Sequence, residues 1–253
     1  NIKQRTLIDM KRKTIEVAQI PNYTLGGLPV DEIGRVVLQS WARWFTGLYA
    51  AGSASSSGFH GADVLQGNRL LDAIAGGEAA GSHAADWIMK RKFTGAAKLE
   101  EAFGLAEAEL SMLGEETEGA VQRLNPVVTR LKEILTSLQT PATVASDYEQ
   151  ALEVLEQLSV QGEQLYCDQT SLIANQNLLE ILRTQSAIRM ASAYVQSALQ
   201  RTESRGLHQR SDFPQSDDEQ LHHNLIFHDG TCTTLALRKG PSGNWILSPS
   251  SAV

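Results

Sequence analysis

A run of small residues at positions 60–86 places the strongest constraint on how this chain can fold. An apolar run at 47–51 and a loop of glycine, serine and alanine at 52–58 precede it, which predicts a strand, a permissive loop and then a helix. Small residues recur at every fourth position of this helix and so share one face: Ala73, Gly77, Gly81 and Ala85. Because each glycine costs a helix about 1 kcal/mol relative to alanine, we expect a close contact on that face, made either with a sheet or with a flat ligand.

The composition is that of a globular chain. Its 253 residues, 42% hydrophobic and 20% charged, can form one large core or two modest ones. The net charge of −7 argues against nucleic acid and anionic membrane surfaces as partners, because neither attracts an acidic protein. No run of about 18 apolar residues is present, so no direct membrane span is expected. The N-terminus has neither an initiator methionine nor a signal-peptide pattern, which favours a piece or a processed form of a longer protein.

The two cysteines, Cys167 and Cys232, lie far apart and lack C-x-x-C spacing. This pattern indicates neither a metal site nor a disulfide framework, and it favours a reducing compartment. The adjacent pair His222 and His223 would diverge on a helix or strand, so a shared metal is not expected there either. His83, within the predicted helix, is expected to be a hydrogen-bonded core or surface residue rather than a ligand.

The pattern of apolar residues divides the chain into three parts, at 1–95, 96–202 and 203–253. In the first part, β-rich segments flank a turn at 31–34 whose last residue is Gly34, which predicts a hairpin. In the second part, apolar residues follow a 3.6-residue period and predict a bundle of three or four antiparallel helices, at 99–113, 127–138, 146–165 and 178–199. The segment 146–149 has the spacing of a capping box. In the third part, a short hairpin is expected around Asp229 and Gly230.

Five motifs follow one another in the order and spacing of a known family: YTLGG at 23–27, GLYAAG at 47–52, GFHGA at 58–62, LLDAIAGGEAAG at 70–81 and ESRGLHQRSDFP at 203–214. On these residues the chain resembles the succinate dehydrogenase, fumarate reductase and L-aspartate oxidase flavoproteins, over residues 20–228 and over the C-terminal half of that family only. The resemblance implies an α+β fold: the C-terminal part of an FAD-binding α/β domain, an antiparallel helical bundle and a short C-terminal extension.

The resemblance also implies FAD as the cofactor, with its isoalloxazine ring against the loop at 58–62 and the start of the following helix. A helix start suits this position, because its N–H groups and dipole stabilise negative charge on a reduced flavin. The cofactor-binding positions carried over are Gly52, Ser53, His60, Gly61, Ala62, Asn68, Arg69 and Leu70. Ser53 departs from the family, which has an acidic residue there that holds the FAD ribose.

The substrate side departs further. The resemblance places Asn22 where the family has a histidine that contacts a dicarboxylate, and Val64 where it has an arginine that grips a substrate carboxylate. Without that arginine the charge of a dicarboxylate is unmatched. Arg69, which replaces a serine, offers a cation one helical turn away and could substitute as an anion contact. No catalytic residue is assigned.

The sequence contains no G-x-G-x-x-G dinucleotide motif, which in the family belongs to the other half. We therefore expect FAD to bind only with a second polypeptide or segment that carries the dinucleotide fold. The resemblance further implies an iron–sulfur subunit as a partner, and a cytoplasmic or matrix-side location, peripheral on a membrane complex. Two functions remain open: a part of an FAD-dependent oxidoreductase, and a non-catalytic structural subunit of a redox assembly.

The densest charged cluster spans residues 203–212: Glu203, Arg205, His208, Arg210 and Asp212. Acidic and basic residues alternate there within one short segment. The cluster is predicted to be a salt-bridged turn that ties the helical bundle to the flavin domain, with a functional relay or an interface as the alternative.

Overall fold

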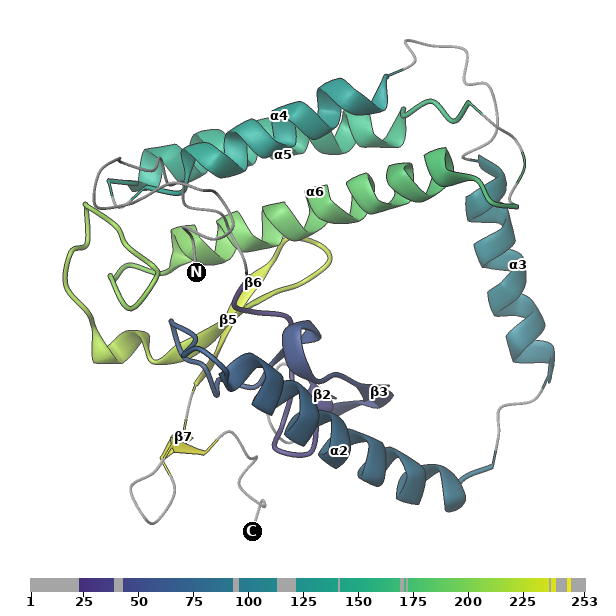
Figure 1. Cartoon of the computed structure of the whole chain (residues 1–253), viewed down its shortest axis with the longest axis horizontal. Coiled ribbons are helices and arrows are strands. Elements are labelled where there is room, and N and C mark those ends of the chain that lie inside the picture. Colours follow the sequence, from purple (N-terminus) through teal and green to yellow (C-terminus); the bar gives the residue numbers. More distant parts are fainter. Residues whose placement is uncertain are drawn as a thin grey trace, which may run out of the picture.

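The computed structural model describes residues 23–38, 43–92, 96–112, 122–140, 142–168, 171, 173–236, 238–239 and 245–246. Over these residues the chain combines five α-helices with four small two-stranded sheets (Figure 1). The helices are α2 (Asn68–Met89), α3 (Ala96–Met112), α4 (Leu124–Ser137), α5 (Ala145–Glu163) and α6 (Gln176–Gln200). The strands are β1 (Leu28–Pro29), β2 (Arg35–Val37), β3 (Trp44–Tyr49), β4 (Ser55–Ser56), β5 (His222–Ile226), β6 (Cys232–Ala236), β7 (Arg238–Lys239) and β8 (Trp245–Ile246). The mixture of helix and strand agrees with the predicted α+β class.

The predicted hairpin turn at 31–34 is present. Val30 and Val36 form an antiparallel bridge, and the N–H of Gly34 donates to the carbonyl of Asp31 at 3.0 Å. Gly34 adopts φ +75°, which a side chain would oppose. β1 itself pairs with β4 in parallel, and β2 pairs with β3 antiparallel, so two short sheets form beside the turn.

Helix α2 packs on these strands through small residues, of which the predicted face supplies Ala73 and the neighbouring face Ala80. A Cβ added to Gly34 would stand 2.6 Å from the Cβ of Ala80, and one added to Gly52 would stand 3.0 Å from that of Ala73. By contrast, a Cβ on Gly77 or Gly81 would meet no atom within 4 Å. The close contact therefore falls on the side of Ala73 and Ala80, and most of the stripe predicted to make it is open within the described chain.

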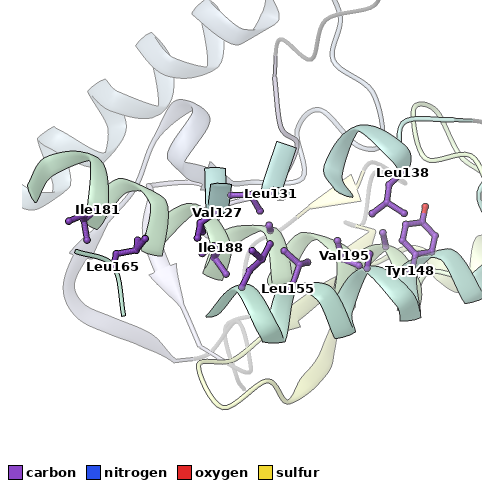
Figure 2. Close-up of a cluster of buried hydrophobic side chains, with 13 residues drawn as sticks. Val127, Leu131, Leu138, Tyr148, Leu155, Leu165, Ile181, Ile188 and Val195 are labelled. Atoms are coloured by element: carbon purple, nitrogen blue, oxygen red, sulfur yellow. The ribbon is translucent and has the colours of Figure 1, made fainter. Parts of the chain in front are cut away.

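Helices α4, α5 and α6 form the main core. Figure 1 shows the three side by side, and Figure 2 shows their apolar side chains meeting between them. Tyr148 lies near Val195 at one end and Leu165 near Ile181 at the other, so α5 and α6 run antiparallel as predicted (Figure 2). The largest side chains here are almost fully buried, including Leu155 at 0% exposed. Helix α3 forms where the period predicts it but stands apart from the other three (Figure 1).

The start of α5 differs from the prediction. The expected capping box at 146–149 is wrong, because the helix begins at Ala145 and Ser146 already lies within its first turn. Instead, the Asp147 carboxylate accepts the N–H of Val144 at 2.9 Å. An acidic side chain in the first turn also favours the helix dipole. At the start of α6 the side chain of Asn175 caps the helix by accepting the N–H of Leu178 at 2.9 Å.

The predicted C-terminal hairpin is present as β5 and β6, with Gly230 at φ +79° in its loop. It lies between α6 and β2 (Figure 1). Leu225 and Leu235 pack with Val37 in a small core, and the side-chain amide of Asn224 donates to the carbonyl of Ser197 at 2.8 Å. The hairpin therefore connects the helical layer to the N-terminal strands. None of the described helices is long and apolar enough to cross a membrane.

Candidate functional site

Three segments meet beside the start of α2: residues 23–27, the short 3-10 turn Gly52–Ala54 and the loop at 58–67. Glycines permit this approach. A Cβ on Gly27 would stand 2.5 Å from the carbonyl oxygen of Ala54, so no side chain fits between these two segments. Gly52 is buried at φ +61° and lies against Ala73 of α2. The sequence thus places backbone, rather than side chains, along the wall beside the helix start.

His60 occupies the loop before α2 with an unusual environment. Its side chain is 9% exposed, and neither ring nitrogen has a hydrogen-bond partner among the described residues. Nε2 lies 3.4 Å from an oxygen of Asp72, close enough for an ion contact if the ring is protonated, but the pair does not meet hydrogen-bond geometry. The rings of Tyr23 and Phe59 meet the imidazole edge-on, at centroid distances of 6.1 and 5.2 Å. A buried imidazole N–H without an acceptor is costly, so this ring is suited to meet a ligand.

The start of α2 retains much of its positive pole. Its N-cap is Gly67, at φ +91°, with no capping side chain, and its first turn has no acidic residue. Two of the expected N–H donors are already engaged within the turn, however, since Asn68 donates to Leu65 at 3.1 Å and Leu70 to Gly67 at 3.2 Å. What this helix start offers a bound group is therefore chiefly its dipole.

The structure brings only some of the predicted site residues together. His60 and Arg69 lie around Tyr23, with the Arg69 guanidinium carbon 5.2 Å from the Tyr23 ring centroid. Gly61 is exposed, and Ser53 is exposed on the 3-10 turn. Val64 is half-buried, and its N–H donates to the carboxylate of Asp63 at 2.7 Å. Asn22 lies outside the described residues.

Two residues of this site were not predicted as site residues. In the sequence, Tyr23 stands out only as part of the YTLGG motif, and Asp72 only as part of the motif at 70–81. The sequence held one signal for each: Tyr23 follows Asn22 directly, and Asp72 lies three residues after Arg69, the spacing of one helical turn.

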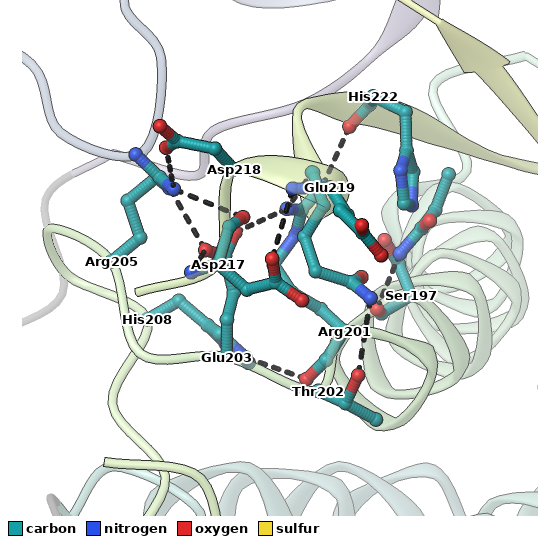
Figure 3. A network of polar contacts seen from close by, with 12 residues as sticks. Ser197, Arg201, Thr202, Glu203, Arg205, His208, Asp217, Asp218, Glu219 and His222 are labelled. Atoms are coloured by element: carbon teal, nitrogen blue, oxygen red, sulfur yellow. Dashed lines mark hydrogen bonds and ion pairs between the residues drawn. The ribbon is translucent and has the colours of Figure 1, made fainter. Parts of the chain in front are cut away.

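The charged cluster at 203–212 forms a network around the buried Glu203, together with Arg201, Asp217 and Asp218 (Figure 3). The Glu203 side chain is 0% exposed and accepts hydrogen bonds from Arg201 at 2.6 Å, Arg205 at 2.9 Å and the N–H of Asp217 at 2.9 Å. Burial alone would raise the pKa of Glu203, but the hydrogen bonds from Asp217, Arg201 and Arg205 outweigh it and hold the pKa below its usual range. Arg205 reaches Asp218 as well, at 3.1 Å.

Arg210 forms a second centre of the same turn. Its side chain is 1% exposed and grips Asp212 with two hydrogen bonds, at 2.9 and 2.6 Å. The Arg210 hydrogen bonds lower the pKa of Asp212 to about 2, although burial opposes them. Asp212 in turn accepts the N–H of Ala145 at 3.0 Å, which holds the turn to α5.

On its other side the turn meets the candidate site. The N–H of Leu207 donates to the carbonyl of Ala62 at 2.9 Å. Residues 203–212 therefore contact both the helical layer, through Ala145, and the loop before α2, through Ala62. Of the two predicted roles, a salt-bridged turn and a functional relay or interface, these contacts agree with the first. Within the described residues, no group of His, Cys, Asp and Glu is placed to hold a metal ion.

Two half-buried histidines make the stability of the protein depend on pH. Burial, and then the charges of Arg201 and His222, lower the pKa of His223 to about 4, and burial also lowers the pKa of His208. Because the folded state resists protonation, stability is fully present above the unfolded pKa of about 6.5 and is lost as the pH falls from there toward 4.

For His223 alone we expect the free energy of unfolding to be about 2 kcal/mol lower at pH 5 than at pH 7.5. His223→Gln should flatten this dependence in urea unfolding measured across that range. His228→Gln, at an exposed position of the same hairpin, serves as the control and should keep the parent's slope. A parent-like slope in His223→Gln would contradict the assignment.

Comparisons with known proteins place these features in context. Residues 3–70 match the model of an FAD binding domain, and residues 129–241 match that of the fumarate reductase flavoprotein C-terminal region. The fumarate reductase flavoprotein subunit of Mycobacterium tuberculosis is 29% identical over 88% of this chain and 38% of its own length. A fumarate reductase (CoM/CoB) subunit of Methanothermobacter marburgensis is 31% identical over 84% of this chain and 36% of its own length.

The fold has counterparts among solved structures. That of E. coli quinol fumarate reductase FrdA superposes with a TM-score of 0.73, at 22% identity, over 91% of this chain and 37% of the FrdA chain. At that identity the likeness concerns the fold. The chain thus spans well under half the length of the relatives that it matches.

Proposed function

This chain belongs to the succinate dehydrogenase and fumarate reductase flavoprotein family, and we propose that it is the C-terminal part of an FAD-dependent oxidoreductase of that type. A segment or second polypeptide with the dinucleotide-binding fold would complete it. The observation that carries the proposal is the meeting of the 23–27 segment, the Gly52–Ala54 turn and the start of α2, at glycines that leave no room for a side chain.

The residues around this meeting point fit FAD. Gly27 and Gly52 keep the wall free of side chains, and Gly61 is exposed with open space where a Cβ would stand. The uncapped start of α2 favours a group that gains negative charge, as a flavin ring does on reduction. The chemistry that FAD supplies is two-electron oxidation and reduction. The chain's own contribution is to seat the ring, to stabilise that charge through the helix dipole and to offer the buried imidazole of His60.

We propose the corresponding domains. Residues 1–95 would belong to the FAD-binding domain, 96–202 to the helical domain, and 203–253 to a turn, hairpin and tail that hold the two together. The contacts of Leu207 with Ala62, and of Asp212 with Ala145, support this division. By analogy with the family, an iron–sulfur subunit would be a further partner, with the assembly cytoplasmic or matrix-side and peripheral on a membrane complex.

A second candidate is a non-catalytic structural subunit of a redox complex. The observation in its favour is Val64, an apolar and half-buried residue at a position where the family binds a carboxylate. The two candidates differ in one measurable property. Flavin bound to the assembled protein would be reduced by a substrate if the protein is an enzyme, and would resist reduction by succinate and related acids if it is structural.

The proposal predicts that this chain holds FAD only in an assembly. Expressed alone, it should leave gel filtration without visible flavin absorbance; co-purified with its completing polypeptide, it should carry about one FAD per chain. Gly52→Ala should lower that occupancy, because its Cβ would press on Ala73, whereas Gly47→Ala, also at positive φ but with open space around it, should not. Stoichiometric flavin on the lone chain would contradict the need for a partner, and an assembly without flavin would contradict the proposed function.

A further inference from the structure

We propose that one side of α2 is the docking surface for the completing polypeptide, the one that carries the dinucleotide-binding fold. The surface consists of five exposed residues, here called the outer stripe: Leu70, Ile74, Gly77, Gly81 and Ile88. At 3.6 residues per turn they fall within about 60° of one another around the helix. The stripe contains no charged residue, and its three large side chains are 67%, 61% and 47% exposed.

A helix that packs on one side only keeps a polar side toward water, and α2 does not. Its inner side already meets the N-terminal strands, since Ala80 lies against Gly34 and the Nδ1 of His83 lies 2.8 Å from the hydroxyl of Tyr49. A helix that is apolar on a second side is typical of one buried between two layers. Contiguous exposed apolar surface marks an interaction site. The described residues supply only the first of these layers.

Gly77 and Gly81 have no packing reason within the described chain. Glycine weakens a helix interior relative to alanine, so a close neighbour is expected wherever it recurs. A Cβ on Gly76, next to them on the inner side, would stand 3.6 Å from the Cβ of Ala51. On Gly77 or Gly81 a Cβ would meet no described atom within 4 Å. Bare backbone on two successive turns is the arrangement expected where a second backbone approaches the helix.

The length and charge of the stripe favour a polypeptide as its occupant. At 1.5 Å per residue, Leu70 and Ile88 lie about 27 Å apart along the helix, farther than a small ligand reaches. An anionic membrane surface does not suit the stripe either. Helices that lie on such surfaces carry lysine and arginine around the apolar face, whereas the exposed residue beside this stripe is Glu78 and the net charge of the chain is −7.

The comparisons indicate which polypeptide this is. The chain covers 38% of the Mycobacterium tuberculosis relative and 37% of the FrdA chain, so most of the length of those proteins has no counterpart here. The stripe begins at Leu70, in the first turn of α2, which the proposed function places beside the flavin. A polypeptide that closes the other side of that site would meet the outer stripe first at Leu70.

This inference rests on the proposed function for the identity of the occupant, but the two can fail separately. If the assembly holds FAD while the outer stripe stays exposed, only this inference fails. If the completing polypeptide covers the stripe and the assembly holds no FAD, only the proposed function fails.

Hydroxyl-radical footprinting of the full chain, alone and in its assembly with the completing polypeptide, tests where docking occurs. Leu70, Ile74 and Ile88 should be oxidised readily in the lone chain and severalfold more slowly in the assembly. Val160 on α5, 55% exposed, should react equally in both. Protection of the stripe in a lone monomer would mean that the chain's own residues cover it. Protection that appears only as the lone chain self-associates in sedimentation would assign the stripe to a second copy. Either result would overturn the proposal.

Replacing both glycines of the stripe, Gly77→Ala with Gly81→Ala, separates docking from folding. In the lone chain the added methyl groups meet open space among the described residues and alanine favours the helix, so the midpoint of urea unfolding should rise. In the assembly the same groups would press on the partner's backbone, and the Kd for the completing polypeptide should rise at least about tenfold.

The matched control is Gly104→Ala, because Gly104 is also a helical glycine, on α3, with open space where a Cβ would stand. Its unfolding midpoint should rise as well, while its Kd should equal that of the parent. An unchanged Kd in the double variant, or an equal loss of affinity in Gly104→Ala, would overturn the outer stripe as the docking surface.

Discussion

Replacing Glu203 with alanine is expected to lower the free energy of unfolding by about 3–4 kcal/mol, measured by urea unfolding at neutral pH. The Glu203 side chain is 0% exposed and accepts hydrogen bonds from Arg201, Arg205 and the N–H of Asp217. Its removal takes one carboxylate from two guanidinium groups, which keep other acceptors, and leaves the N–H of Asp217 without this acceptor. The arginine side chains are 20% and 29% exposed, so water recovers part of the loss, which keeps the expected value at the low end for a buried pair.

The control for this variant is Glu180→Ala. Glu180 pairs with Arg183 at 2.5 Å, but the two side chains are 52% and 67% exposed, and an ion pair of this kind contributes at most about 1 kcal/mol. Glu203→Gln should fall between the two, because an amide keeps the volume and one acceptor oxygen. If the losses in Glu203→Ala and Glu180→Ala were equal, burial of the network would not be what makes it stabilising.

Local features of the fold were predictable from the sequence wherever the signal was periodic or belonged to a turn. The 3.6-residue period placed α4, α5 and α6, and Gly34 and Gly230 marked the turns at which the chain reverses. The start of α5 was mispredicted because Ser146 and Glu149 have the spacing of an N-cap and an N3 residue, whereas the backbone begins the helix at Ala145 and places Asp147 at N3.

Which individual residues of distant segments meet could not be predicted from the sequence. Spacing showed that four small residues share a face of α2, but only Ala73 of that face is approached closely, by Gly52, while Gly34 approaches Ala80 outside it. The same limit applies to Glu203. Its charge was visible within the motif, whereas its partners Arg201 and Asp217 flank the motif and are selected by how the chain folds back.

The candidate site, too, could be predicted from the sequence only in part. The order of motifs predicted that the loop before α2 and the helix start face a flavin ring, and this stays a prediction. The order could not give the state of each group. Two of the expected N–H donors are engaged within the turn, whereas the nitrogens of His60 have no hydrogen-bond partner among the described residues. Whether a group is hydrogen-bonded depends on differences of less than one ångström in side-chain and backbone positions, and residue spacing does not specify these.

Gly206→Ala is expected to lower the free energy of unfolding by about 2–5 kcal/mol. Gly206 adopts φ +56°, where an L side chain costs about 1–2 kcal/mol. A Cβ there would also stand 2.5 Å from the carbonyl oxygen of Ala62, a backbone atom that cannot rotate away, and overpacking of this kind adds about 1–3 kcal/mol. Relief of the clash must move the turn off the loop before α2, which would lengthen the 2.9 Å hydrogen bond from Leu207 to Ala62.

Gly61→Ala separates the two contributions. Gly61 has nearly the same backbone angle, φ +60°, but a Cβ there would meet no atom within 4 Å, so only the conformational cost of about 1–2 kcal/mol should remain. Hydrogen exchange gives the second measurement, since the amide of Leu207 should exchange faster in Gly206→Ala and at the parent's rate in Gly61→Ala. Equal losses of stability in the two variants, with Leu207 still protected in both, would mean that the turn accommodates the Cβ at position 206 without a further loss of stability. The close approach of Gly206 to Ala62 would then not be what holds residues 203–212 against the candidate site.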